Sequence, residues 1–540
     1  MTSRTTSLPA SFLIRAAGLG ILAGGLAALA LGQDANWDLR NYHYYNPYAW
    51  LHGRLGYDIA PAQVATYYNP LLHLPFYLVV EALPPRLVGF LLGALQGLCL
   101  VPLAAISLLL LPPEPQERQQ RLALVLGLIG LAGAGSVSEL GTSFGDGILA
   151  LPILASLWLL LRQQPLLATP GCGRGLLLAL AAGLLTGLTA GLKQPAAVYA
   201  VGLCLACLAL AAPWSRRILV ALVFGLGVLA GIALTGGWWL LTMWQEYGNP
   251  LFPYFNHLFR SEMAAIADYR DSRFLPQGLG EAFFFPLFFL AAPEETAEVA
   301  FRDGRLPMAA LLFILVLLTR RRRPVPAAAT REGCRQGLFL VFVLGSYLAW
   351  LKLFAIYRYL LVLEILAPVA IWLLVARLLP EPAPARRWGT ICLGVVLLVT
   401  RPADWGREPW RPDFFGVQVP ALDDPAHTVV LMAGVDPMSY LIPFFPAPVR
   451  FLRIQSYFTG PSATPNGTDR LLARLVAGHR GPAYVLYRSY EGKAAGTALA
   501  AYGLAADLAA CQKLRPGIES RLPDPLLFCP VAPIPEADKP

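Results

Sequence analysis

The sequence predicts an all-α polytopic membrane protein followed by a small C-terminal α/β domain. Of the 540 residues, 56% are hydrophobic and 14% are charged, and the mean hydropathy is +0.55. Soluble domains carry about 25% charged residues. Long apolar runs recur between Phe12 and Val399, and they stop beyond Arg401. This composition excludes a soluble enzyme, a disordered scaffold and a disulfide-rich mini-protein.

Apolar segments of roughly 17–25 residues are long enough to cross about 30 Å of hydrocarbon. We expect about eleven such transmembrane helices, and they make up a membrane domain over residues 1–401. The predicted spans are residues 10–32, 86–111, 122–137, 146–162, 175–191, 196–213, 217–243, 306–319, 336–352, 359–379 and 388–400.

The distribution of Lys and Arg predicts the orientation. These residues are denser in one set of short connections, which includes Arg216, Arg217 and the run Arg320–Arg323. Cytoplasmic loops carry such an excess, so the net charge of +9 is attributed to topology and not to nucleic-acid binding. We expect a bacterial inner-membrane protein with a cytoplasmic N-terminus and a periplasmic domain over residues 402–540. Ala28–Ala30 resembles a signal cleavage site, but the run before it is long for a signal peptide, which favours a retained anchor.

The first predicted periplasmic loop, residues 33–85, is rich in aromatic residues, and interfacial helices are expected at 38–53 and 66–83. An aromatic belt at the membrane interface is enough to explain the aromatic residues. It does not explain the polar residues among them, and loops of this length usually carry function. A second long periplasmic loop is expected at 245–305.

Asp38 follows the first span by a few residues and is the main catalytic candidate. A carboxylate near the membrane surface can act as a general base towards an acceptor hydroxyl or amine. The alternative is a structural role, as a helix N-cap or as an ion-pair partner of Arg40 or Arg54.

Two cations and one buried acid are the other candidates. Lys193 lies in a turn between two spans, and Arg358 lies at the outer end of the tenth. Such cations can hold a phosphate, or they can extend to the interface as membrane-flanking cations do. Glu364 lies inside a span, where it must be paired or bind a ligand.

No cofactor is expected. The sequence has no Walker motif, no dinucleotide fingerprint after a strand and no HExxH. His43, His52 and His73 lie in one loop, but their spacing is not typical of a zinc site, so a divalent metal is the disfavoured alternative. Nucleic acid is not an expected partner.

The C-terminal domain alternates strand and helix patterns. Thr428–Ala433 and Ala483–Arg488 are predicted strands, and helices are expected at 466–476 and 495–509. Cys511 and Cys529 are expected to pair in an oxidising periplasm.

The chain resembles the GT-C superfamily of integral-membrane glycosyltransferases, and within it the bacterial mannosyltransferase-like and aminoarabinose-transferase-like members. The resemblance rests on the multi-span plan, the loop that begins Asn36-Trp-Asp-Leu-Arg40, the Lys193-Gln-Pro turn, the Tyr357-Arg-Tyr element and the soluble C-terminal domain.

This resemblance implies an inverting enzyme that transfers a sugar from a polyprenyl-monophosphate carrier to a periplasmic acceptor. Asp38 is then the general base, and Lys193 and Arg358 hold the donor phosphate. The residues implied in sugar or acceptor binding are Arg40, Tyr42, His43, Tyr45, Asp58, Gln63, Tyr67, Tyr68, Asn69 and Glu364. The expected partners are the lipid-linked donor, the bilayer and an acceptor of unknown type. The alternatives are a transporter or flippase of a lipid-linked glycan, and a non-catalytic membrane scaffold.

Overall fold

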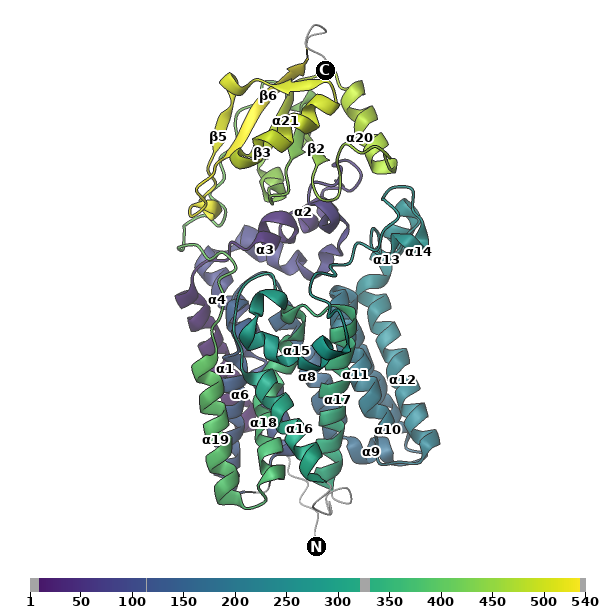
Figure 1. Ribbon diagram of the computed structural model, residues 1–540, viewed down its shortest axis with the longest axis vertical. Helices are drawn as coiled ribbons and strands as arrows, with labels where there is room; N and C mark the ends of the chain where they lie inside the picture. The colour runs from purple at the N-terminus through teal and green to yellow at the C-terminus, as the bar shows by residue number, and fades with distance from the viewer. Residues whose placement is uncertain (1–8, 113, 321–330, 535–540) are drawn as a thin grey trace. The chain divides into compact units, whose positions relative to one another are not determined.

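The computed structural model describes residues 9–112, 114–320 and 331–534 (Figure 1). The described chain is mostly helical and divides into two compact units. Unit 1 comprises Met1–Leu31, Gly89–Gly237 and Asp271–Trp405, and unit 2 comprises Gly32–Val88, Trp238–Arg270 and Gly406–Pro540. Unit 2 therefore combines the predicted soluble domain with the first predicted loop and part of the second. Of the arginines that predicted the orientation, Arg321–Arg323 lie outside the described residues.

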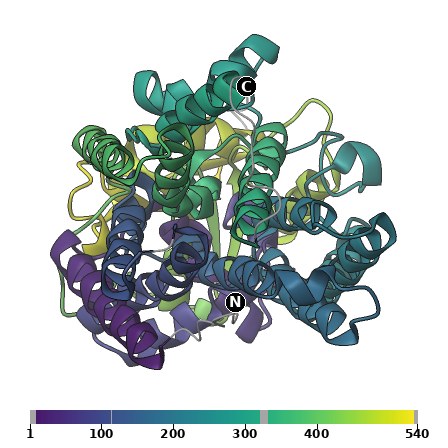
Figure 2. The ribbon, with the colours of Figure 1, turned by 90° about the horizontal axis from the view of Figure 1, so that it is seen from below.

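Helices form where the apolar runs predicted them, and Figure 2 shows several of them end on. The helices that lie in unit 1 or continue into it are α1 (Ala10–Leu31), α4 (Pro85–Gly97), α5 (Leu100–Leu110), α6 (Gln116–Leu131), α7 (Ala134–Ser138), α8 (Asp146–Arg162), α9 (Gln164–Ala168), α10 (Gly173–Leu192), α11 (Ala197–Leu208), α12 (Trp214–Ile232), α15 (Leu279–Ala291), α16 (Arg305–Arg320), α17 (Arg331–Leu353), α18 (Leu361–Leu378) and α19 (Pro382–Val399).

Six helices of the described chain are long and apolar enough to cross a membrane, as expected of a multi-pass membrane protein. They are Ala10–Leu31, Pro85–Leu110, Gly173–Leu192, Trp214–Tyr247, Arg331–Leu353 and Tyr357–Leu378. The other predicted spans are also helical, but they are shorter or less apolar. The total of about eleven spans stays a prediction.

The interior of unit 1 is built around α18, almost all of whose side chains are buried. It packs against α16, α6 and α19. Glycines bring α10 and α12 into close contact, because a Cβ atom at Gly183 would lie 2.0 Å from the carbonyl oxygen of Phe224. At Gly187 the same atom would lie 2.1 Å from the carbonyl oxygen of Val228. Small residues four apart are a common device for packing membrane helices.

The C-terminal part of unit 2 is a mixed sheet with the strand order β2-β1-β3-β6-β4, and β5 pairs with β6. The parallel strands β1, β2 and β3 are in register at Leu431, Leu452 and Val485. Helix α21 packs on these three strands (Figure 1). The elements are β1 (Val429–Ala433), β2 (Arg450–Gln455), α20 (Gly467–Gly478), β3 (Ala483–Arg488), α21 (Gly492–Ala501), β4 (Leu504–Ala506), β5 (Gln512–Leu514) and β6 (Leu526–Pro533).

Both predicted strands and the first predicted helix of this domain are confirmed. Helix α20 begins after Asn466, whose side chain accepts a hydrogen bond from the backbone N–H of Asp469. The side chain of Asp469 accepts a hydrogen bond from the backbone N–H of Asn466, which completes a capping box. The second predicted helix forms as α21 but ends at Ala501, because the chain turns at Gly503 (φ +69°) into β4.

The first predicted loop packs on this sheet within unit 2. Ile59 pairs with β2: its N–H donates to Phe451 O, and its carbonyl accepts from Arg453 N, each at 3.0 Å. The loop carries a π-helical turn over Leu39–His43, α2 (Tyr45–Leu51) and α3 (Leu74–Ala82). Helix α13 (Trp238–Tyr247), the end of the helical run Trp214–Tyr247, belongs to unit 2, and so does α14 (Asn256–Phe259) from the second predicted loop. Short broken helices therefore replace the longer interfacial helices expected here.

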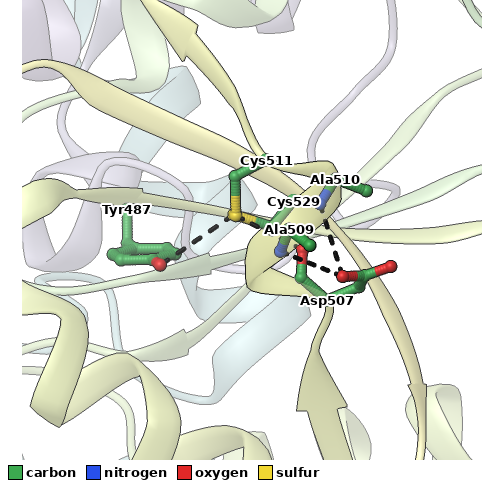
Figure 3. Close-up of a disulfide and its surroundings, with 6 residues drawn as sticks. All are labelled: Tyr487, Asp507, Ala509, Ala510, Cys511 and Cys529. Carbon is green, nitrogen blue, oxygen red and sulfur yellow. Dashed lines mark hydrogen bonds between the residues drawn. A yellow bond between two sulfur atoms is a disulfide. The ribbon is translucent and has the colours of Figure 1, made fainter.

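The predicted Cys511–Cys529 disulfide is present in the C-terminal sheet (Figure 3). Cys529 is buried in β6, and the hydroxyl of Tyr487 lies 3.9 Å from its Sγ. The bond closes a loop of 18 residues.

Removing this disulfide should destabilise the C-terminal sheet. A loop of this length restricts the unfolded chain by about 3 kcal/mol. We expect the Cys511→Ser/Cys529→Ser double variant to lower the urea concentration at which a protease cleaves the C-terminal domain. Cys172→Ser, at a free and half-buried cysteine, is the control. Equal cleavage midpoints for the two variants would contradict the prediction.

Candidate functional site

The predicted site residues fall into two groups, one in each unit. Asp38 and the residues of the first loop lie in unit 2, whereas Lys193, Arg358 and Glu364 lie in unit 1. Each group is built from its own neighbours.

Asp38 is half-buried and immediately precedes the π-helical turn Leu39–His43. Its side chain makes no capping hydrogen bond. Both arginines considered as its partners form ion pairs with other carboxylates: Arg40 with Glu519 at 2.9 Å and Arg54 with Asp58 at 2.6 Å. The structure thus accounts for both arginines without assigning them to Asp38.

Tyrosines from three distant segments gather around Asp38. The hydroxyl of Tyr42 lies 3.5 Å from Asp38 Oδ2, and its ring meets the ring of Tyr68 edge to face at 5.1 Å. The hydroxyls of Tyr68 and Tyr254 are hydrogen-bonded to each other. Tyr457 follows β2, and the surrounding protein atoms and the charges of Tyr254 and Asp38 raise the pKa of its phenol. This cluster presents phenol rings and hydroxyls beside a carboxylate.

Tyr457 and Tyr254 were not identified from the sequence. Tyr457 is 55% exposed and comes just after the carboxyl end of a parallel strand, the edge at which open α/β sheets bind ligands. The position after a strand was the signal that could have identified Tyr457. Recognising it required a prediction of strand β2, which we did not make from the sequence.

Two histidines of the first loop lie beside the tyrosine cluster. The rings of His43 and His73 stack at 3.9 Å, and Tyr42 meets both of them edge on. Both histidines are buried. No group of three or more His, Cys, Asp or Glu residues that could hold a metal ion occurs among the described residues.

Several other predicted binding residues make contacts that hold unit 2 together. Asp58 accepts hydrogen bonds from Arg54, from the hydroxyl of Tyr45 at 3.0 Å and from the N–H of Phe451 at 3.0 Å. Gln63 donates to the carbonyl of Val435 at 2.8 Å. These contacts join the first loop to the sheet.

Tyr67 and Asn69 also have structural partners. The ring of Tyr67 is buried against Phe252 and Tyr247. Asn69 caps a short 3₁₀ turn by accepting a hydrogen bond from Leu71 N. Of the predicted sugar-binding residues, Tyr42 and Tyr68 belong to the tyrosine cluster beside Asp38, and a sugar-binding role for all of them stays a prediction.

Lys193 and Arg358 come together in unit 1. Lys193 follows α10, pairs with Asp146 at 2.5 Å and donates to the carbonyl of Phe144 at 3.1 Å. Arg358 pairs with Glu298 at 3.2 Å. Both cations lie over the ring of Tyr359, with Lys193 Nζ at 5.7 Å and Arg358 Cζ at 5.1 Å from its centroid.

A narrow pocket of about 20 Å³ opens beside these cations, lined by Asp146, Pro195, Tyr199, Arg358 and Tyr359 among others. The rings of Phe144 and Trp405 also lie near Arg358, at 5.4 and 5.9 Å from Cζ. Two cations over one aromatic ring can bind an anion.

Glu139 interacts with these cations, and the sequence alone assigned it no role in a site. It ends α7, its side chain is buried, and it interacts electrostatically with Asp146, Lys193 and Arg358. The available signal in the sequence was its position in a short turn between two predicted spans. A single acidic residue in such a turn is a weak signal.

Glu364, expected to be paired or to bind a ligand, is paired with hydrogen-bond donors. It accepts hydrogen bonds from the hydroxyl of Tyr357 at 2.6 Å and from the N–H groups of Gly135 and Ser136 at 2.9 and 2.8 Å. Its side chain is fully buried. These contacts fix α7 to α18 and account for the cost of placing an acid there.

Comparisons of the chain with family models, with curated proteins and with solved structures return no match.

Proposed function

We propose that this protein is an inverting glycosyltransferase that moves a sugar from a polyprenyl-monophosphate carrier to an acceptor. The observation that carries the proposal is the convergence of Lys193 and Arg358 on the ring of Tyr359, beside a pocket. A chain with several apolar helices meets its lipid substrate in the bilayer, and two adjacent cations suit the phosphate of such a lipid.

The proposed chemistry gives each group one role. Asp38 accepts the proton of the acceptor as the acceptor attacks the anomeric carbon. The bond between that carbon and the phosphate oxygen breaks, and the electron pair leaves with the polyprenyl phosphate. Lys193 and Arg358 stabilise the charge that grows on this leaving group. A single displacement inverts the anomeric centre.

The tyrosine cluster suits the sugar or the acceptor. The hydroxyl of Tyr42 lies next to Asp38, Tyr68 and Tyr254 add two further hydroxyls to the cluster, and Tyr457 adds an exposed ring. Aromatic faces pack against the C–H faces of sugars while hydroxyls bind the sugar oxygens.

The proposal includes a location in the bacterial inner membrane, with about eleven spans and the C-terminal domain in the periplasm. The Cys511–Cys529 disulfide supports the periplasmic side, because disulfides persist in oxidising compartments. In intact cells we expect a membrane-permeant maleimide to label Cys172 and Cys334, which lie on the predicted cytoplasmic side. A membrane-impermeant maleimide should not label them. Labelling of these cysteines by the impermeant reagent would show that the orientation is opposite to the proposed one.

The decisive experiment uses the full chain in lipid nanodiscs with a panel of polyprenyl-monophosphate sugars, read as release of polyprenyl phosphate. We expect Lys193→Ala and Arg358→Ala each to lower the rate by about 10²–10³-fold, as removal of one transition-state donor does. Lys352→Ala, at an exposed lysine of α17, should leave the rate unchanged.

Donors that bind but stay intact with every acceptor would instead indicate a transporter of lipid-linked glycans. No binding and no turnover across the panel would leave a scaffold as the better explanation. Wild-type rates in both cation variants would remove the proposed phosphate site.

A further inference from the structure

Glu139 is an unusual buried acid. Glu139 is 3% exposed, and neither of its carboxylate oxygens accepts a hydrogen bond from the described residues. An ionised carboxylate in such a place is costly, and buried polar groups are otherwise nearly always hydrogen-bonded.

A short backbone turn links Glu139 to Phe144, whose carbonyl binds Lys193. Its carbonyl accepts from the N–H of Thr142 at 3.0 Å and from the Thr142 hydroxyl at 2.7 Å, which closes the turn that leads to Phe144. The carbonyl of Phe144 in turn binds Lys193. Glu139 is thus positioned by the same short turn that positions the lysine.

The surrounding charges favour a neutral Glu139. The two cations, Lys193 and Arg358, are already matched by Asp146 and Glu298. Burial, followed by the negative charge of Asp146, raises the pKa of Glu139 well above its ordinary value. The other titratable groups that interact with Glu139 are Glu364 from α18 and Tyr199 from α11.

We propose that Glu139 is a third ligand of the phosphate: a neutral carboxyl group that donates its hydrogen to a phosphate oxygen held by Lys193 and Arg358. The inference rests on the proposed function and names as the ligand the phosphate monoester that leaves in that reaction. In the resting protein Asp146 and Glu298 occupy the cations, and the entering phosphate replaces them. The narrow pocket beside the cations is lined by Arg358 and Tyr359 and has room for about one water-sized group.

The sign of the pH dependence follows from the protonation state. Below its raised pKa, Glu139 carries the hydrogen that it donates. As the pH rises through that pKa, the group becomes an anion, loses the donor and repels the phosphate. Binding therefore weakens towards alkaline pH.

The test measures binding of farnesyl phosphate and of inorganic phosphate to the full chain in nanodiscs, by calorimetry between about pH 5 and pH 9. At the acidic end, Glu139→Ala should weaken farnesyl phosphate binding about 10–100-fold, as loss of one hydrogen bond to a charged group does. Glu139→Gln keeps an N–H donor and should bind within about threefold of wild type, with a weaker pH dependence. The second ionisation of the phosphate, near about pH 6, is common to all variants and cancels in the comparison.

Glu298→Gln is the matched control, because it removes the charge of a carboxylate paired with Arg358 and should strengthen binding. Opposite effects at Glu139 and Glu298 exclude a general effect of acidic charge. The same pattern with inorganic phosphate would assign the site to the phosphate itself, and its restriction to farnesyl phosphate would assign it to a lipid phosphate.

Tighter binding by Glu139→Ala would show an ionised, repelling carboxylate and would overturn the proposal. Unchanged binding by Glu139→Ala, or no binding by the wild type, would overturn it as well. None of these measurements requires sugar transfer, so their outcome is separate from that of the turnover experiment. Size-exclusion profiles and thermal midpoints identify any variant that has lost its fold. If Glu139→Ala does not fold, the pH dependence of binding by Glu139→Gln decides: the same dependence as in the wild type would overturn the proposal.

Discussion

Replacing Asp38 with asparagine should lower the rate of sugar transfer by about 10²–10⁴-fold, the usual contribution of a general base. Asparagine has nearly the same shape but cannot accept the proton of the acceptor. The measurement is release of polyprenyl phosphate in the presence of acceptor, compared with binding of the intact donor. We expect the binding to change little, because the proposed phosphate ligands are other residues.

Asp34→Asn is the matched control for Asp38. Asp34 is buried and accepts hydrogen bonds from the backbone N–H and the side-chain amide of Asn36, at 3.1 and 2.7 Å. Its role is to shape the turn, so the variant should lose stability before it loses chemistry. A larger loss of rate per folded molecule in Asp34→Asn than in Asp38→Asn would transfer the role of base to Asp34.

Replacing Glu519 with alanine should destabilise unit 2 by about 3–5 kcal/mol, the cost of breaking a buried ion pair. Glu519 binds Arg40 from the first loop at 2.9 Å and Arg488 from the end of β3 at 2.8 Å. The side chains of Arg488 and Glu519 are each 2% exposed. Alanine leaves Arg40 without this carboxylate and leaves Arg488 with Asp436 as its remaining ion-pair partner.

Urea-dependent proteolysis of the C-terminal domain measures this loss. Glu117→Ala is the control, because Glu117 and its partner Arg121 are almost fully exposed and such pairs contribute about 0–1 kcal/mol. Similar midpoints for Glu519→Ala and Glu117→Ala would show that the buried network contributes little. Glu519→Gln, which keeps one acceptor oxygen, should fall between wild type and Glu519→Ala.

Local patterns were enough to predict the parts of the fold that depend on nearby residues. The apolar runs predicted the helices of unit 1, and the hydrophobic runs ended by Gly434 and by Arg488 predicted β1 and β3. The helical pattern at 466–476 predicted α20. These signals arise from hydrophobic periodicity and from backbone hydrogen bonds within a few residues.

The remainder depends on residues far apart in the chain. Arg40 was predicted to bind substrate, but its carboxylate partner Glu519 lies 479 residues later. Asp58 was also predicted to bind substrate, and here a local signal was present: Arg54 lies four residues earlier, the spacing of a helical ion pair.

The role of Glu139 could not be inferred from its own segment. Lys193 and Arg358 come from other parts of the chain, and only the fold brings their charges to a carboxyl that has no hydrogen-bond donor among the described residues. A sequence shows which groups can ionise, but the cost of ionisation depends on burial and on neighbours that it does not reveal.

The discontinuous construction of unit 2 has a consequence for synthesis. The first segment of unit 2 ends at Val88, whereas the strands on which it packs begin at Val429, about 340 residues later. At about 5–20 residues per second, the ribosome needs roughly 20–70 s to cover this distance. During that interval the edge of the loop at Ile59 has no β2 to pair with, and Arg40 has no Glu519. The nascent chain must therefore wait, partly folded, until translation is nearly complete, and a message that ends early leaves this loop exposed to proteases and chaperones.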